Sequence, residues 1–133
     1  MVGPYAICKI MVFQGNQLAA LVKMAFSMAA VDGKFADEEK AAITLGMAEF
    51  GLNKDMIIAC LAVADEMNAG EALGILTSMN TEQKKYATGY LAAVMAADGD
   101  IADDEVKMWQ LICTLAQFPT MSVIEALTFW KNN

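Results

Sequence analysis

The sequence predicts an all-α fold, a single-domain bundle of seven to eight helices that takes in residues 1–133. Apolar residues recur at helical spacing along most of the chain, and no segment combines sustained two-residue alternation with β-branched residues. Apart from the terminal pair, every asparagine stands directly before an apolar helical pattern, where its side chain can accept from the first free backbone N–H groups. With 133 residues, of which 57% are hydrophobic, the chain is long enough to bury one large core.

Capping residues, prolines and glycines mark where the helices begin and end. Asn16 and Asn53 each precede a helix. Three capping boxes are expected, in which a cap and a Glu or Gln three residues later bond reciprocally: Asn68 with Glu71, Asn80 with Gln83, and Ser122 with Glu125. The prolines Pro4 and Pro119 lie near helix starts, and glycines that tolerate positive φ end or separate helices at Gly15, Gly51 and Gly99. The predicted helices cover about 4–13, 17–31, 37–50, 54–67, 69–79, 81–97, 103–117 and 121–131.

Two of these helices belong in the centre of the bundle. Helix 17–31 carries only Lys23 and Ser27 as clearly polar interior residues, and the second half of helix 81–97 is apolar all round. Helices 37–50 and 103–117 instead begin with acidic residues and carry their apolar residues mainly on one face. In the second of them, the predicted core stripe consists of Val106, Trp109, Cys113 and Ala116, widened by Met108, Leu111, Ile112 and Leu115. We expect the C-terminal pair Phe129 and Trp130 to pack on the bundle.

The charge and the missing residue types exclude several functional classes. The net charge is −7, there is no histidine, and all nine basic residues are lysines. Such a chain repels phosphate and lacks arginine forks, which argues against nucleic-acid binding. Without histidine, the usual general base, the Ser or Cys triads and most zinc sites are absent. The three cysteines, Cys8, Cys60 and Cys113, stand in apolar runs and are expected to be buried, reduced thiols.

The apolar runs are too short for a membrane span. The longest cover residues 56–64 and 90–97, whereas a span requires roughly 18 residues. The N-terminal apolar run is interrupted by Lys9 and lacks a basic n-region, so no signal peptide is expected. These features predict a cytoplasmic protein without direct membrane insertion. The high apolar content also suggests an apolar face that meets a protein partner.

An internal repeat organises the chain. Residues 30–45 and 96–111, 66 positions apart, share seven identical residues where chance gives about one or two. Each copy reads as an apolar helix, an Asp-Gly corner, one apolar residue and an acidic helix start, with the repeats extending over about 17–51 and 81–118. The identical residues are Ala30, Asp32, Gly33, Ala36, Asp37, Glu39 and Leu45 in the first copy.

The two corners predict a candidate metal site. Asp32 and Asp98 end apolar helices, where a carboxylate is mildly unfavourable unless it accepts backbone N–H groups of the next turn or lies beside a cation. Glu39 and Glu105 occupy the third position of the following helices, from which a carboxylate reaches back towards the corner. If both pairs converge, the carboxylates repel one another and would protonate, spread apart or recruit a cation, with Asp100 as an optional extra ligand. Oxygen ligands alone select Ca²⁺, Mg²⁺ or Mn²⁺. The alternative is that the corners are only connectors.

An EF-hand does not fit, because Val94 and Ala96, or Met28 and Ala30, would occupy its first ligand positions. The duplicated pattern of Ala30, Asp32, Gly33, Phe35 and Glu39 and of Ala96, Asp98, Gly99, Ile101 and Glu105 instead resembles the TerB-like family of tellurite-resistance proteins. The resemblance implies a bundle of about seven helices with an acidic cluster that is proposed to bind a divalent metal. It also implies a role in metal or oxidant stress and in membrane-associated complexes. Related sequences usually place Ser, Thr or Pro where this chain has Ala36 and Ala102, which are poor caps.

Three functional hypotheses follow from these features. The first is a non-enzymatic binding or sensing module whose acidic pocket holds a divalent cation and whose apolar face meets a protein. The second is a helical interaction scaffold without metal. The third is a carboxylate metal-dependent hydrolase, which is disfavoured because the chain lacks the His of di-metal helical bundles and any Arg or His to stabilise a developing negative charge.

Overall fold

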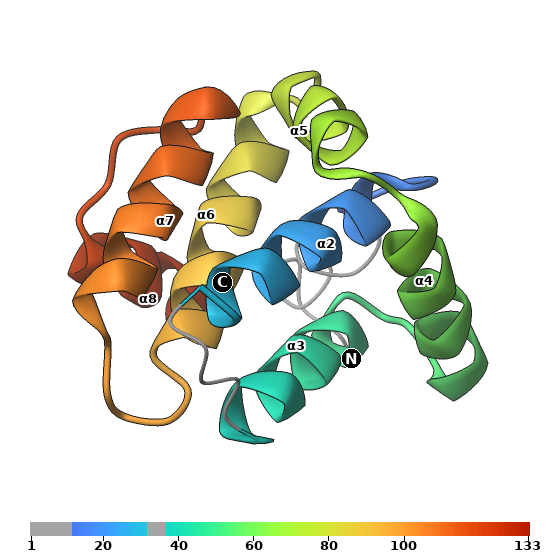
Figure 1. The fold of residues 1–133 in the computed structure, drawn as a ribbon, viewed down its shortest axis with the longest axis horizontal. Coiled ribbons are helices and arrows are strands. Elements are labelled where there is room, and N and C mark those ends of the chain that lie inside the picture. The colour runs from blue at the N-terminus through green and yellow to red at the C-terminus, as the bar shows by residue number, and fades with distance from the viewer. Residues whose placement is uncertain (1–11, 32–36) are drawn as a thin grey trace.

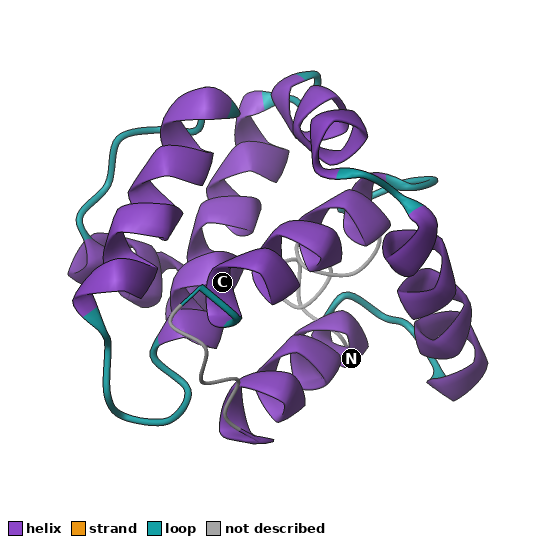
Figure 2. Cartoon of the chain, in the orientation of Figure 1, coloured by secondary structure: helices purple, strands orange, loops and turns teal. Residues whose placement is uncertain are grey.

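The structure is a computed structural model, which describes residues 12–31 and 37–133. The regular secondary structure of the described residues is entirely helical, with no strand (Figure 2). The helices are α2 (Gln17–Ala29), α3 (Asp37–Glu49), α4 (Lys54–Glu66), α5 (Ala69–Thr77), α6 (Thr81–Met95), α7 (Asp103–Leu115) and α8 (Val123–Asn132). The predicted all-α class is therefore confirmed. The first predicted helix lies almost wholly outside the described residues, and its last two positions, Val12 and Phe13, are not helical.

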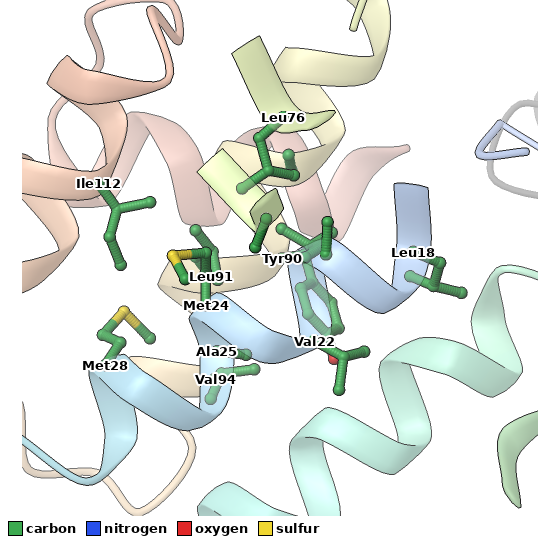
Figure 3. Packing of buried hydrophobic residues seen from close by; sticks show 14 of the residues in the cluster. Leu18, Val22, Met24, Ala25, Met28, Leu76, Tyr90, Leu91, Val94 and Ile112 are labelled. Atoms are coloured by element: carbon green, nitrogen blue, oxygen red, sulfur yellow. The ribbon is translucent and has the colours of Figure 1, made fainter. Parts of the chain in front are cut away.

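Helices α2 and α6 form the centre of the bundle, as their apolar surfaces predict. Helix α2 packs against α4, α5 and α6, and α6 packs against α3, α7 and α8 (Figure 1). Nine of the 13 residues of α2 are buried, and α6 is buried continuously from Tyr86 to Ala92. Figure 3 shows Met24, Ala25, Leu91 and Val94 between these helices. Removal of this apolar surface from water is the main force that holds the helices together.

Aromatic rings attach α8 to the core. The ring of Trp130 lies 5.4 Å from that of Phe50 and 5.7 Å from that of Tyr90, between ring centroids. Phe129 contacts Tyr86 at 5.1 Å in the same edge-to-face manner. Edge-to-face pairs of this kind add about 0.5–1.5 kcal/mol to the area that they bury. The predicted packing of Phe129 and Trp130 on the bundle is therefore confirmed.

Most of the predicted caps are present. The side chains of Asn53, Asn68, Asn80 and Ser122 each accept the N3 backbone N–H, and the boxes of Asn80 with Gln83 and Ser122 with Glu125 are complete. The predicted box at Asn68 is only half formed, because Glu71 accepts from the Asn68 side-chain amide instead of the backbone. Asn16 makes no side-chain cap. Helix α8 begins at Val123 because Ser122 is its cap, two residues later than predicted.

Helices α3 and α7 correspond position by position. Their bounds are 66 residues apart at both ends, which is the offset of the sequence repeat. Both end in a Schellman motif: the N–H of Leu52 donates to Met47 O at 3.2 Å, and that of Phe118 donates to Cys113 O at 2.8 Å. The intervening residue has positive φ in both, 95° at Gly51 and 60° at Gln117.

The core stripe of α7 is narrower than predicted. Trp109, Ile112 and Ala116 are buried, and the Trp109 indole N–H donates to Thr88 O at 3.3 Å. Leu111 and Leu115, predicted to widen the stripe, are instead 51% exposed each. The prediction failed because the neighbouring helices cover only one side of α7.

Candidate acidic site

The second corner, residues 96–105, is fully described. Ala96 caps the end of α6, Gly99 adopts φ 80°, and Ala102 precedes α7 without a side-chain cap. An Oδ1 oxygen of Asp98 accepts the backbone N–H of Asp100 at 3.0 Å. Asp98 thus turns onward to satisfy the backbone of the next turn, as the sequence predicts, and Gly99 supplies the positive φ that the turn needs.

Glu39 and Glu105 are the two buried carboxylates among the described residues. Each is the third residue of its helix, α3 or α7, and each is only 1% exposed. The other acidic residues near the corners are exposed, namely Asp37, Glu38, Asp98, Asp100, Asp103 and Asp104. A carboxylate taken out of water costs several kcal/mol unless hydrogen bonds or a cation replace the lost hydration. Two such residues at equivalent positions therefore require an explanation.

Of the two buried carboxylates, that of Glu39 most clearly lacks described groups that replace its lost hydration. Its Oε2 oxygen is buried and has no hydrogen-bond partner within the described part of the chain. Buried polar atoms are nearly always satisfied, so an exception points to a strained group or to a partner outside the described residues. A cation, for which a carboxylate oxygen is a natural ligand, fits this donor.

The described residues do not by themselves complete a metal centre. Across residues 12–31 and 37–133, no three Asp, Glu or Cys side chains gather closely enough to hold a metal ion. Asp98, Asp100 and Glu105 therefore do not form a site alone. The remaining predicted ligand, Asp32, lies outside the described residues. Asp37 is almost fully exposed, and its carboxylate lies 3.8 Å from the ammonium of Lys40.

The entrance to the first corner nevertheless lies beside the start of α7. Val31, the residue directly before Asp32, lines a shallow hollow of about 280 Å³ together with Asp104, Lys107, Met108 and Leu111. The ends of α2 and α6 lie on the same side of the bundle (Figure 1). Val31 thus lies beside residues 104–111 of α7, the helix that follows the second corner.

A larger cavity, which the sequence did not reveal, lies between α2 and α4. It has a volume of about 400 Å³ and an apolar lining that includes Phe13, Leu18, Leu52, Met56 and Cys60. Helix α4 has a single buried residue, Ala64, although residues 56–64 are an unbroken apolar run. The sequence signal for this cavity was that α4 has more apolar residues than its packing against the core buries.

The two described cysteines are free thiols with suppressed reactivity. Burial raises the pKa of Cys60 above its ordinary value and raises the pKa of Cys113 to about 12. Both are partly rather than fully buried, and Cys8 lies outside the described residues. Thiols of this kind are poor nucleophiles and poor metal ligands at neutral pH.

No described helix combines the length and the apolar character that crossing a membrane requires.

Comparisons with known proteins identify a related solved structure. No family model and no curated protein match the sequence. Among solved structures, the chain is similar to PG1108 from Porphyromonas gingivalis, whose crystal structure is described as that of a protein of unknown function. The two share 42% sequence identity over 92% of each chain, with a TM-score of 0.82. The chain belongs to the same family as this Porphyromonas gingivalis protein.

Proposed function

We propose that this chain is a non-enzymatic binding module whose two acidic corners bind one divalent cation. The proposed ligands are Asp32, Glu39, Asp98, Asp100 and Glu105. They supply only oxygen atoms, which suit Ca²⁺, Mg²⁺ or Mn²⁺ and disfavour softer metals. The chain contributes the charge and the two rigid helix starts that orient the glutamates.

The observation that carries the proposal is the burial of Glu39, with an Oε2 oxygen that no described group satisfies. Glu105 is equally buried at the equivalent position of α7, which agrees with an internal helix–corner–helix repeat over 17–51 and 81–118. The hollow that joins Val31 to the first turns of α7 supports an arrangement in which the corners face each other. In that arrangement, a bound cation, a shared proton or hydrogen bonds would stabilise the two buried carboxylates.

A scaffold without metal is the second candidate. It is favoured by the missing side-chain cap at Ala102, which leaves backbone N–H groups at the start of α7 for a nearby carboxylate to satisfy. In that case the two glutamates only stabilise the corners. The two candidates differ in what the glutamate side chains must supply. A cation site needs their negative charge, whereas a scaffold needs only side chains of this shape that can accept a hydrogen bond.

Thermal unfolding separates the two. The wild-type protein is melted in chelator and then in millimolar Ca²⁺, Mg²⁺ or Mn²⁺. A cation at a hundred times its Kd adds about 2.7 kcal/mol, which raises Tm by several degrees for a domain of this size. The rise should disappear in a Glu39→Gln, Glu105→Gln variant, which keeps the shape of both side chains.

The control is a variant of equal charge change at the exposed helix starts, Asp37→Asn with Asp103→Asn. It should keep the cation-dependent rise in Tm. Identical melting curves for the wild-type protein in chelator and in every cation would support the scaffold.

The remaining features of the proposal come from the TerB-like resemblance. A role in tellurite, metal or oxidant stress, in a cytoplasmic protein that joins a membrane-associated complex, is proposed on that basis. The lack of His and Arg supports a module without catalytic activity.

A further inference from the structure

Helix α7 carries an exposed apolar strip that the core does not use. Leu111 and Leu115 are each 51% exposed, and Val31, from the end of α2, is 44% exposed. Val31, Leu111 and the partly buried Met108 line the same hollow. We call Val31, Met108, Leu111 and Leu115 the α7 strip. From Met108 to Leu115 it follows helical spacing of three and four residues over two turns.

The α7 strip is only partly repeated in the sequence of α3. In α3, the residues equivalent to Met108, Leu111 and Leu115 are Ala42, Leu45 and Glu49. Ala97 is the equivalent of Val31. At the three helical places, α3 thus has one smaller side chain, one identical leucine and one charged side chain. Contiguous exposed apolar residues are uncommon unless they meet a partner.

Carboxylates border the strip at the N-terminal end of α7. Asp98, Asp100, Asp103 and Asp104 are all exposed, and Asp104 lines the same hollow as Val31. Among the described residues, Lys107 is the one basic residue in the lining of that hollow. Four carboxylates against one ammonium, in a chain of net charge −7, give this end a negative potential.

We propose that the α7 strip binds an amphipathic helix of a partner protein, with apolar residues over Val31, Leu111 and Leu115 and lysine or arginine residues over the acidic corner. Helix-in-groove recognition uses apolar anchors at this spacing, and complementary charge sets the orientation. From Asp104 to Leu115 the surface is about 16 Å long, which matches about three turns of a partner helix. A second copy of the chain brings another charge of −7, and an anionic membrane is repelled by the same carboxylates.

The test uses a synthetic amphipathic peptide of about 14 residues, with leucines at i, i+4 and i+7 and lysines towards one end. Binding is followed by fluorescence anisotropy in chelator, so that the result does not depend on the proposed cation site. We expect saturable binding to the wild-type chain. A Leu111→Ser, Leu115→Ser variant should bind at least tenfold more weakly. The control, Leu45→Ser with Ile124→Ser, alters two exposed residues away from the strip and should bind as the wild type does.

The charge part of the proposal is tested separately. A peptide with glutamates in place of the lysines should not bind, and Asp103→Asn with Asp104→Asn should weaken binding of the lysine peptide at low salt. Circular dichroism and Tm establish that each variant is folded.

Four results would overturn the proposal. They are a lack of saturable binding to the wild type, equal binding of a scrambled lysine–leucine peptide, equal loss in the control variant, and unchanged binding in Leu111→Ser, Leu115→Ser. Self-association that the Leu111→Ser, Leu115→Ser variant abolishes, measured by sedimentation, would assign the strip to a second copy. Binding to anionic phospholipid vesicles that the same variant abolishes would assign it to a membrane, and either result would replace the proposed partner.

Discussion

The hydroxyl of Tyr90 in α6 donates to the backbone carbonyl oxygen of Ile43 in α3 at 2.9 Å. The ring of Tyr90 lies where a side chain at Gly46, one turn further along α3, would stand. In α7 the position equivalent to Gly46 is Ile112, and in α2 the position equivalent to Tyr90 is Met24. Ile112 and Met24 lie in the same core (Figure 3). The missing side chain at Gly46 thus leaves the space that the ring of Tyr90 fills, which keeps this part of the core closely packed.

Gly46→Ala should destabilise the protein by about 1–3 kcal/mol, because overpacking a filled site forces neighbouring groups to move. The new Cβ would overlap the ring of Tyr90, which is fully buried and held by its hydrogen bond to Ile43. Urea unfolding measures the change.

Gly74→Ala is the matched control. Gly74 also lies within a helix, α5, and a Cβ there meets no other atom within 4 Å. Alanine should stabilise this helix by up to about 1 kcal/mol, because it has the better helix propensity. Equal effects of the two substitutions would contradict the predicted clash at Gly46.

Exchanging the two left-handed residues should give effects of opposite sign. Gly51 and Gln117 occupy equivalent places in the Schellman motifs after α3 and α7, with φ 95° and 60°. Gly51→Gln should destabilise the protein by about 1–2 kcal/mol, because a Cβ is strained in this region. Gln117→Gly should stabilise it by up to about 1 kcal/mol, since the strain is relieved at some cost in unfolded-state entropy. Thermal unfolding tests both, and a destabilising Gln117→Gly would contradict the prediction.

The two described thiols should react with an aryl disulfide at different rates. Burial raises the pKa of Cys113 to about 12, so roughly one molecule in ten thousand carries its thiolate at pH 8. The pKa of Cys60 is also raised by burial, but this residue lines the apolar cavity between α2 and α4, which is open to solvent. In a Cys8→Ser background, Cys60 should therefore be labelled first. Cys60→Ser and Cys113→Ser variants assign the two phases, and faster labelling of Cys113 would contradict the prediction.

The capping box of α8 should make stability depend on acid pH. The backbone N–H of Ser122 donates to Glu125 Oε1 at 3.0 Å, and this bond is the main cause that lowers the pKa of Glu125. A hydrogen bond with the Ser122 side chain lowers this pKa further. Since the pKa is lower in the folded state, the stabilisation is present above the unfolded pKa of about 4.3 and is lost as the pH falls through the folded pKa. The difference in Tm between the wild type and Glu125→Gln should therefore shrink from pH 7 to pH 3. A constant difference over this range would count against the box.

The helix starts were predictable because capping is a local interaction. The side chains of Asn53, Asn80 and Ser122 each accept from the backbone N–H three positions away, so their neighbours in sequence determine the result. Asn16 fails for a tertiary reason. Gln17 accepts both the N–H of Gln14 and the side-chain amide of Gln83, and Asn16 does not have the extended backbone that a cap needs. A contact with Gln83, 66 residues away, is invisible in a local pattern.

The acidic site was predictable only in part, and for a similar reason. The repeat placed Glu39 and Glu105 at the third helical position, and the turn at Asp98 followed from its residue type. That both glutamates are buried, whereas Asp103 and Asp104 are exposed, depends on which side of each helix the bundle covers.

The sequence by itself determined the seven described helices, most of their caps, the offset of 66 between α3 and α7, and the all-oxygen chemistry of the corners. Each of these depends on the spacing and type of neighbouring residues. Only the tertiary structure decided that Glu39 is buried without a described partner, that Leu111 and Leu115 face outward, and that Tyr90 fills the space above Gly46. The reason is that helical spacing establishes which residues share a face, while the packing of distant helices determines which faces are covered.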